Sequence, residues 1–139
     1  IVGSSTADWD SAFVLQHPTA CVCTDRSINM RCANAYGAFP RVFRMYVRNR
    51  HLMPFEEAVM KMTSMPARII KLKDRGVLKD GAWADVVVFD PERVADTATI
   101  EEPKKYPVGI DYVIVNGEVV AEKGKHTGKR PGKVLRKLD

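Results

Sequence analysis

The first half of the chain carries apolar residues at helical spacing, interrupted by one short run of small and β-branched residues. That run, at 19–24, predicts a buried strand that ends at Asp25. Residues 26–37 lack periodicity and predict a loop. The other apolar positions predict four helices. The first begins at a cap within 5–10 and ends at about Gln16, and the second runs from Pro40 to about Arg50. The third covers 55–62, and the fourth covers 65–70 after a Ser64 cap. The helix from Pro40 presents one apolar face, made of Val42, Phe43, Tyr46 and Val47.

Strand signals dominate from Lys73 onward. Short apolar and β-branched runs separated by turn residues predict strands over 76–78, 85–89, 112–115 and 118–121. Asn116-Gly117 predicts a type I′ turn between the last two strands. The connection at 91–111 is long and rich in proline and charge. Because four short strands without an opposing sheet leave their edges unpaired, we expect them to pair with strands from elsewhere.

The length and composition narrow the class of protein. With 139 residues, the chain is long enough for one domain but too short for a complete eight-stranded α/β barrel, which needs about 250 residues. Hydrophobic residues make up 45% and charged residues 28%, as in soluble globular proteins. No apolar run approaches the roughly 20 residues of a membrane span. The first residues lack a basic region and an initiator Met, so we expect a processed or truncated chain without a signal peptide.

The net charge of +5 is concentrated near the end of the chain. A basic cluster can contact nucleic acid or an acidic surface. No aromatic residues alternate with these basic ones, which favours a solvated tail around a partner domain and no nucleic-acid partner. The basic residues are Lys123, Lys125, Lys129, Arg130, Lys133, Arg136 and Lys137.

The three cysteines do not form a disulfide framework, because their number is odd and two of them are only two residues apart. Cys21 and Cys23 share one face of the predicted strand. Two buried thiols are favoured over a metal site, since the chain has no Cys-x-x-Cys or His-x-His pair. Cys32 falls in the predicted loop, as an ordinary loop residue or a reactive thiol. This cysteine usage predicts a reducing, cytoplasmic compartment.

Several longer motifs point to one family. Residues 76–90 carry Gly-x-Leu-x-x-Gly-x-x-Ala-Asp-Val-Val-Val-Phe-Asp, which resembles a stretch near the C-terminus of amidohydrolase-superfamily enzymes. Residues 53–67 resemble the helix pair of the same superfamily. The segments 35–42, 106–117 and 124–132 narrow the resemblance to the N-acyl-D-amino-acid deacylase (D-aminoacylase) family.

The resemblance implies a fold. Members of the family combine a metal-bearing α/β barrel with a smaller β-sandwich built from both chain ends. We therefore expect an α+β fragment, in which 1–72 supplies the last strand and helices of the (β/α) barrel. Residues 73–139 then supply the C-terminal strands of the composite β-sandwich and the basic tail. Trp83 and Phe89 are expected to pack inside the sandwich, and Asp85 to accept hydrogen bonds from the turn amides at 81–83.

The resemblance also implies zinc-dependent hydrolysis of the amide bond of N-acyl-D-amino acids. Thr24-Asp25 matches the Ser-Asp or Thr-Asp pair at the end of the family's last barrel strand, so Asp25 is the expected catalytic residue, as general base and then acid. Zinc ligands of the family are mainly His and Cys from earlier strands. The histidines present, His17, His51 and His126, match none of those positions, so this chain alone is expected to bind no metal.

The expected partners follow from that resemblance. They are the missing N-terminal barrel portion, in the same gene product or on a separate chain, and a small N-acyl amino acid substrate. No membrane partner is expected, and a homo-oligomer is left open. Two departures favour an alternative, a non-catalytic binding or assembly module: Arg26 stands where the family has Gly, and Cys32-Ala33-Asn34 where it has His-Pro-Arg.

Overall fold

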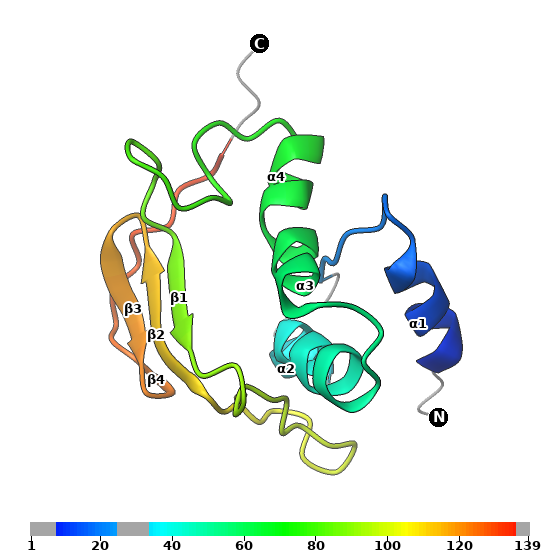
Figure 1. Ribbon diagram of the computed structural model, residues 1–139. Coiled ribbons are helices and arrows are strands. Elements are labelled where there is room, and N and C mark those ends of the chain that lie inside the picture. The colour runs from blue at the N-terminus through cyan, green and yellow to red at the C-terminus, as the bar shows by residue number, and fades with distance from the viewer. Residues whose placement is uncertain (1–7, 25–33, 136–139) are drawn as a thin grey trace.

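The computed structural model describes residues 8–24 and 34–135, as a sheet with helices on one side of it. Figure 1 shows α2, α3 and α4 beside the sheet, and α1 on the side of these helices that is farther from it. None of the described helices is long and apolar enough to cross a membrane. The helices are α1 (Asp8–Gln16), α2 (Asn34–Arg41), the π-helix η1 (Val42–Asn49), α3 (Phe55–Met62) and α4 (Ser64–Ile69); the strands are β1 (Val86–Phe89), β2 (Ile110–Val115), β3 (Glu118–Glu122) and β4 (Lys125–His126).

The sheet is antiparallel throughout, with the strand order β1-β2-β3-β4. The type I′ turn between β2 and β3 is confirmed, because Asn116 and Gly117 both have positive φ, at 49° and 84°. Three of the predicted strands are confirmed as β1, β2 and β3. The strand predicted at 76–78 is wrong, because the chain turns at Asp74 (φ 56°), whose carbonyl accepts the Trp83 N–H at 2.9 Å. The short strand β4 was not predicted.

The helices predicted to end at Gln16 and to cover 55–62 are confirmed. The loop predicted over 26–37 is wrong at its end, since α2 begins at Asn34 and continues past a kink at Gly37 into η1. Pro40 lies in the first turn after that kink, where the missing N–H costs little. Ser64 is not a cap: Thr63 precedes α4 without a side-chain cap, and its hydroxyl donates to the Val59 carbonyl at 2.7 Å.

The helices and the sheet share one core. Phe43 of η1 stacks on Phe55 of α3 at 5.0 Å between ring centroids, and lies 5.1 Å from Phe89 of β1. Phe89 therefore packs against helices, where we had expected sandwich packing. The predicted apolar face of η1 is confirmed, and the core crosses the division expected at residue 72. Its buried members are Ala12, Leu15, Val42, Phe43, Tyr46, Met53, Ala58 and Val94.

Asp85 has other partners than those predicted. One of its carboxylate oxygens accepts the Asn116 N–H at 2.8 Å, and the other pairs with Arg75. The expected bonds to the amides at 81–83 are thus wrong, because the β2–β3 turn approaches Asp85 more closely in the fold. Trp83 is 46% exposed, with the Arg75 guanidinium 4.9 Å and the Lys133 ammonium 5.2 Å from its ring centroid. Lys133 of the basic segment therefore lies beside Trp83 of the same chain.

An arginine cluster on η1 and the end of α2 attaches the helices to the segment after β1. Arg44 donates to both oxygens of Asp96, at 2.5 and 2.9 Å, and Arg41 lies 3.6 Å from the same carboxylate. Arg48 donates to the carbonyls of Pro91 and Val94 at 2.8 and 2.6 Å. Burial alone would raise the pKa of Asp96, but the hydrogen bonds and charge of Arg44, aided by Arg41, hold it below its ordinary value of 3.8.

Replacing Asp96→Asn should therefore destabilise the protein in a pH-dependent way. The folded-state pKa is lowered, so the carboxylate contributes stability above its unfolded pKa, and that contribution is lost as pH falls through the folded value. We expect a loss of about 1–3 kcal/mol in the free energy of unfolding at neutral pH, which shrinks in acid. Denaturant titrations of the complete protein at several pH values measure it. Glu118→Gln, in the exposed pair with Lys129, is the control and should cost less than about 1 kcal/mol. A loss that does not vary with pH would contradict this account.

A comparison of Gly109 with Gly117 separates the cost of a steric clash with the main chain from the cost of a left-handed backbone conformation. It has φ +78°, and an added Cβ would lie 2.5 Å from the Val94 nitrogen. Gly117 has φ +84° with nothing within 4 Å of such a Cβ. Gly117→Ala should cost about 1–2 kcal/mol for its left-handed backbone. Gly109→Ala should cost about 1–3 kcal/mol more, because the clash is with the main chain. The two free energies of unfolding, measured side by side, should differ; equal values would refute the close approach.

Candidate functional site

The described part of the candidate site is the segment that leads to Asp25. Asp25 itself, Arg26, Cys32 and Ala33 lie outside the described residues, and for Asn34 only the backbone is described, as the first residue of α2. Residues 17–24 follow α1 and are described. The site is therefore built from the contacts that hold this segment.

The segment predicted as a strand, 19–24, pairs with no strand among the described residues. Residues 20–24 are extended but join no sheet, and Val22 N–H donates to the Lys61 carbonyl at 2.9 Å. A strand forms only with neighbours that accept and donate along its length, and the described residues supply this bond and no ladder. The alternation holds: Val22 packs against the core, whereas Cys21 and Cys23 are both exposed. The expectation of buried thiols is wrong for the described structure, in which no element covers their face of the segment.

Lys61 of α3 anchors this segment through its side chain. Its side chain is fully buried, at 0% exposure. The ammonium donates to the carbonyls of His17 at 2.6 Å and Ala20 at 3.2 Å, and lies 3.5 Å from the Glu57 carboxylate. Two of the ammonium's three donors thus bond main-chain carbonyls, and the nearby Glu57 carboxylate supplies an opposite charge for the buried one. Sequence reasoning missed Lys61, although its spacing of three from the buried Ala58 places it on the inner face of α3.

The histidines take ordinary structural positions. His17 Nδ1 forms a hydrogen bond with the Thr19 hydroxyl at 2.9 Å, and His126 Nδ1 accepts the Gly128 N–H at 2.9 Å. His51 is exposed, two residues after the end of η1, with φ 50°. Within residues 8–24 and 34–135, no three His, Cys, Asp or Glu side chains come together to hold a metal ion. The described residues therefore do not form a metal site among themselves.

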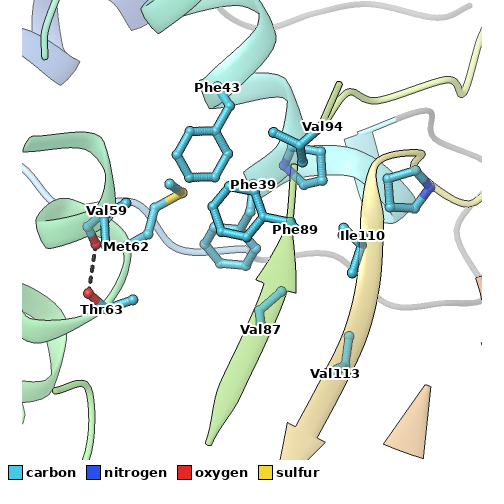
Figure 2. Close-up of a pocket in the computed structure, with 12 residues that line it drawn as sticks. Phe39, Phe43, Val59, Met62, Thr63, Val87, Phe89, Val94, Ile110 and Val113 are labelled. Atoms are coloured by element: carbon cyan, nitrogen blue, oxygen red, sulfur yellow. Dashed lines mark hydrogen bonds between the residues drawn. The ribbon is translucent and has the colours of Figure 1, made fainter. Parts of the chain in front are cut away.

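Two hollows lie near these elements. One, of about 430 Å³, is bordered by Cys21, Cys23, Leu15 and Tyr46, and so opens beside the extended segment. The other, of about 330 Å³, lies between the helices and the sheet. Figure 2 shows the side chains of η1, α3, β1 and β2 that converge on it. Among the residues that line this hollow, the one side-chain hydroxyl is that of Thr63, which donates to the Val59 carbonyl. The lining is therefore apolar and carries no free reactive group.

The fold defines an α+β piece, an antiparallel sheet covered on one side by helices, with an extended segment held beside α3. A family model described as "Amidohydrolase family" matches residues 21–121. The chain belongs to the amidohydrolase family. The match begins in the extended segment and ends in β3, so it includes both Lys61 and the core.

Individual relatives show which members of the amidohydrolase family this chain is similar to. An N-acyl-D-glutamate deacylase of Alcaligenes xylosoxydans xylosoxydans is 48% identical over 102 residues, which are 73% of this chain and 21% of that protein. A D-aminoacylase variant solved with CuCl2 has a TM-score of 0.74 at 45% identity, over 76% of this chain and 22% of that chain. The N-acyl-D-glutamate deacylase of Bordetella bronchiseptica, solved with zinc and a phosphonate inhibitor that mimics the tetrahedral intermediate, has a TM-score of 0.68 at 49% identity, over 76% of this chain and 22% of that chain.

These likenesses confirm the resemblance to the D-aminoacylases that the motifs predicted. The relatives are named as hydrolases that act on amide bonds, and their fold matches this α+β piece. The chain spans about a fifth of the length of the relatives it matches.

Proposed function

We propose that this chain is the C-terminal part of a zinc-dependent amidohydrolase that hydrolyses the amide bond of N-acyl-D-amino acids. The observation that carries the proposal is the 49% identity, over 76% of this chain, to a deacylase solved with zinc and a mimic of the tetrahedral intermediate. Since the chain spans about a fifth of that relative, it acts only with the remaining barrel portion, on the same polypeptide or a separate one, and is inactive alone.

In this proposal, 1–72 supplies the last barrel strand and its helices, and 73–139 the C-terminal strands of a composite sandwich. The extended segment at 20–24 supports the first assignment, because its Cys21 and Cys23 face has nothing covering it in the described structure. The four-stranded sheet supports the second, since β1 and β4 each have only one neighbour within it. Both features leave backbone groups for strands of the rest of the protein.

Asp25 is the proposed catalytic residue. Its carboxylate would take a proton from the attacking water and pass it to the amine nitrogen as the amide bond breaks. Zinc in the complete enzyme would polarise the amide carbonyl. We place the zinc ligands in the rest of the protein, a placement supported by the described residues, in which no three His, Cys, Asp or Glu side chains come together to hold a metal ion.

A second candidate function is a non-catalytic binding or assembly module. It is favoured by Arg26 and by Cys32-Ala33-Asn34, which depart from the family motif next to Asp25. Native mass spectrometry in zinc-containing buffer separates the two. A complex with zinc and a larger chain supports the enzyme, and a metal-free homo-oligomer supports the module. A cytoplasmic location stays a prediction from cysteine usage.

In the complete protein, Asp25→Asn should lower kcat for N-acetylated D-amino acids by about 10²–10⁴-fold, because it removes the proton-transfer group. The zinc content, measured by elemental mass spectrometry, should not change. Asp80→Asn, at an exposed turn position, is the matched control and should keep full activity. Retained turnover in Asp25→Asn contradicts the catalytic assignment. A zinc-loaded wild-type protein without turnover on D- or L-substrates supports the module.

A further inference from the structure

We propose that Lys61 is a positioning residue, which fixes the segment 17–24 and thereby sets where Asp25 stands. The inference rests on the proposed function of Asp25 and adds a residue that acts through it. Lys61 lies in α3, more than thirty residues further along the chain, and its buried side chain reaches back to the segment.

Lys61 holds the segment at two points. Its ammonium binds the carbonyls of His17 and Ala20, at 2.6 and 3.2 Å, and its own carbonyl accepts the Val22 N–H at 2.9 Å. One residue therefore fixes both the turn after α1 and the extended stretch that follows. Val22 is three residues before Asp25, a reach of at most about 10 Å of extended chain.

The anchor itself is rigid. α3 buries Ala58 completely and stacks Phe55 on Phe43 at 5.0 Å, so the helix is fixed in the shared core. A continuous path of contacts thus leads from the core through Lys61 to the segment. Positions of this kind matter because a displacement of about 1 Å at a reacting group can cost 10²-fold in rate.

The choice of lysine argues for positioning rather than for packing. A buried ammonium is costly to desolvate, and an apolar residue of similar volume often stabilises a core as well or better. Here two of its three partners are main-chain carbonyls of the same short segment, whereas the third, Glu57, lies on the solvent side with its side chain 34% exposed. The buried charge is therefore directed at the path of this segment.

Lys61→Met in the complete protein is the decisive variant, because it keeps the shape and removes every side-chain donor. We expect kcat to fall about 10–100-fold with KM changed less than about threefold. Hydrogen exchange at 17–24 should become faster, and zinc content should stay unchanged. Lys73→Met, at an exposed position, is the matched control and should keep kcat within about twofold.

A double variant shows whether Lys61 acts through Asp25. If it does, Lys61→Met with Asp25→Asn should be no slower than Asp25→Asn alone. Additive losses overturn the inference, and so does a normal kcat in a Lys61→Met protein with faster exchange at 17–24. If Lys61→Met does not fold, Lys61→Gln, which keeps a neutral donor, takes its place under the same criteria. Turnover retained by Asp25→Asn refutes the proposed function instead, so the two failures are distinguishable.

Discussion

A buried ammonium, on Lys61, is the constraint on which the arrangement of the first half of the chain depends. A charge without access to water has to find acceptors, and Lys61 finds two of them in the carbonyls of His17 and Ala20. His17 directly follows α1, where the helix dipole places partial negative charge, so a cation is favoured there. The same residue therefore ties α1, the extended segment and α3 together, and the path of the segment is fixed without any sheet ladder.

The sheet matters to this site because it immobilises the helices that carry Lys61. Phe43, Phe55 and Phe89 form one aromatic cluster that joins η1, α3 and β1. The bidentate pair of Arg44, the residue after Phe43 in η1, with Asp96 adds a polar attachment of η1 to the segment after β1. Apolar packing holds the elements together but fixes their relative orientation only weakly. The bidentate pair between the guanidinium and the carboxylate fixes that orientation. Together they leave α3 little freedom to shift, which is what an anchor for a reacting group requires.

The sequence pattern correctly predicted those helices and turns that are determined by residues close together in the chain. The helix at 55–62 follows from its spacing and its acidic first turn, and the hairpin from Asn116-Gly117, so both were predictable. The errors have tertiary causes. The segment at 19–24 has the composition of a strand, yet pairing needs neighbours that the described residues do not supply. Asp85 bonds Asn116, which is 31 residues away, and no local pattern encodes that contact. Lys61 looked like an ordinary charged helix residue until the approach of the segment was known.

On the proposed function, the rest of the enzyme covers apolar and thiol side chains that are exposed in the described structure. Phe13 and Leu78 are 79% and 83% exposed. Cys21 and Cys23 face outward from a segment that has no covering element in the described structure. The segment is held on the side that faces Lys61, and its cysteine side is uncovered in the described structure. The cysteine side is therefore the one that is available for contact. On the proposed function, the rest of the enzyme covers that side and brings the zinc, whereas this chain contributes the placement of one carboxylate.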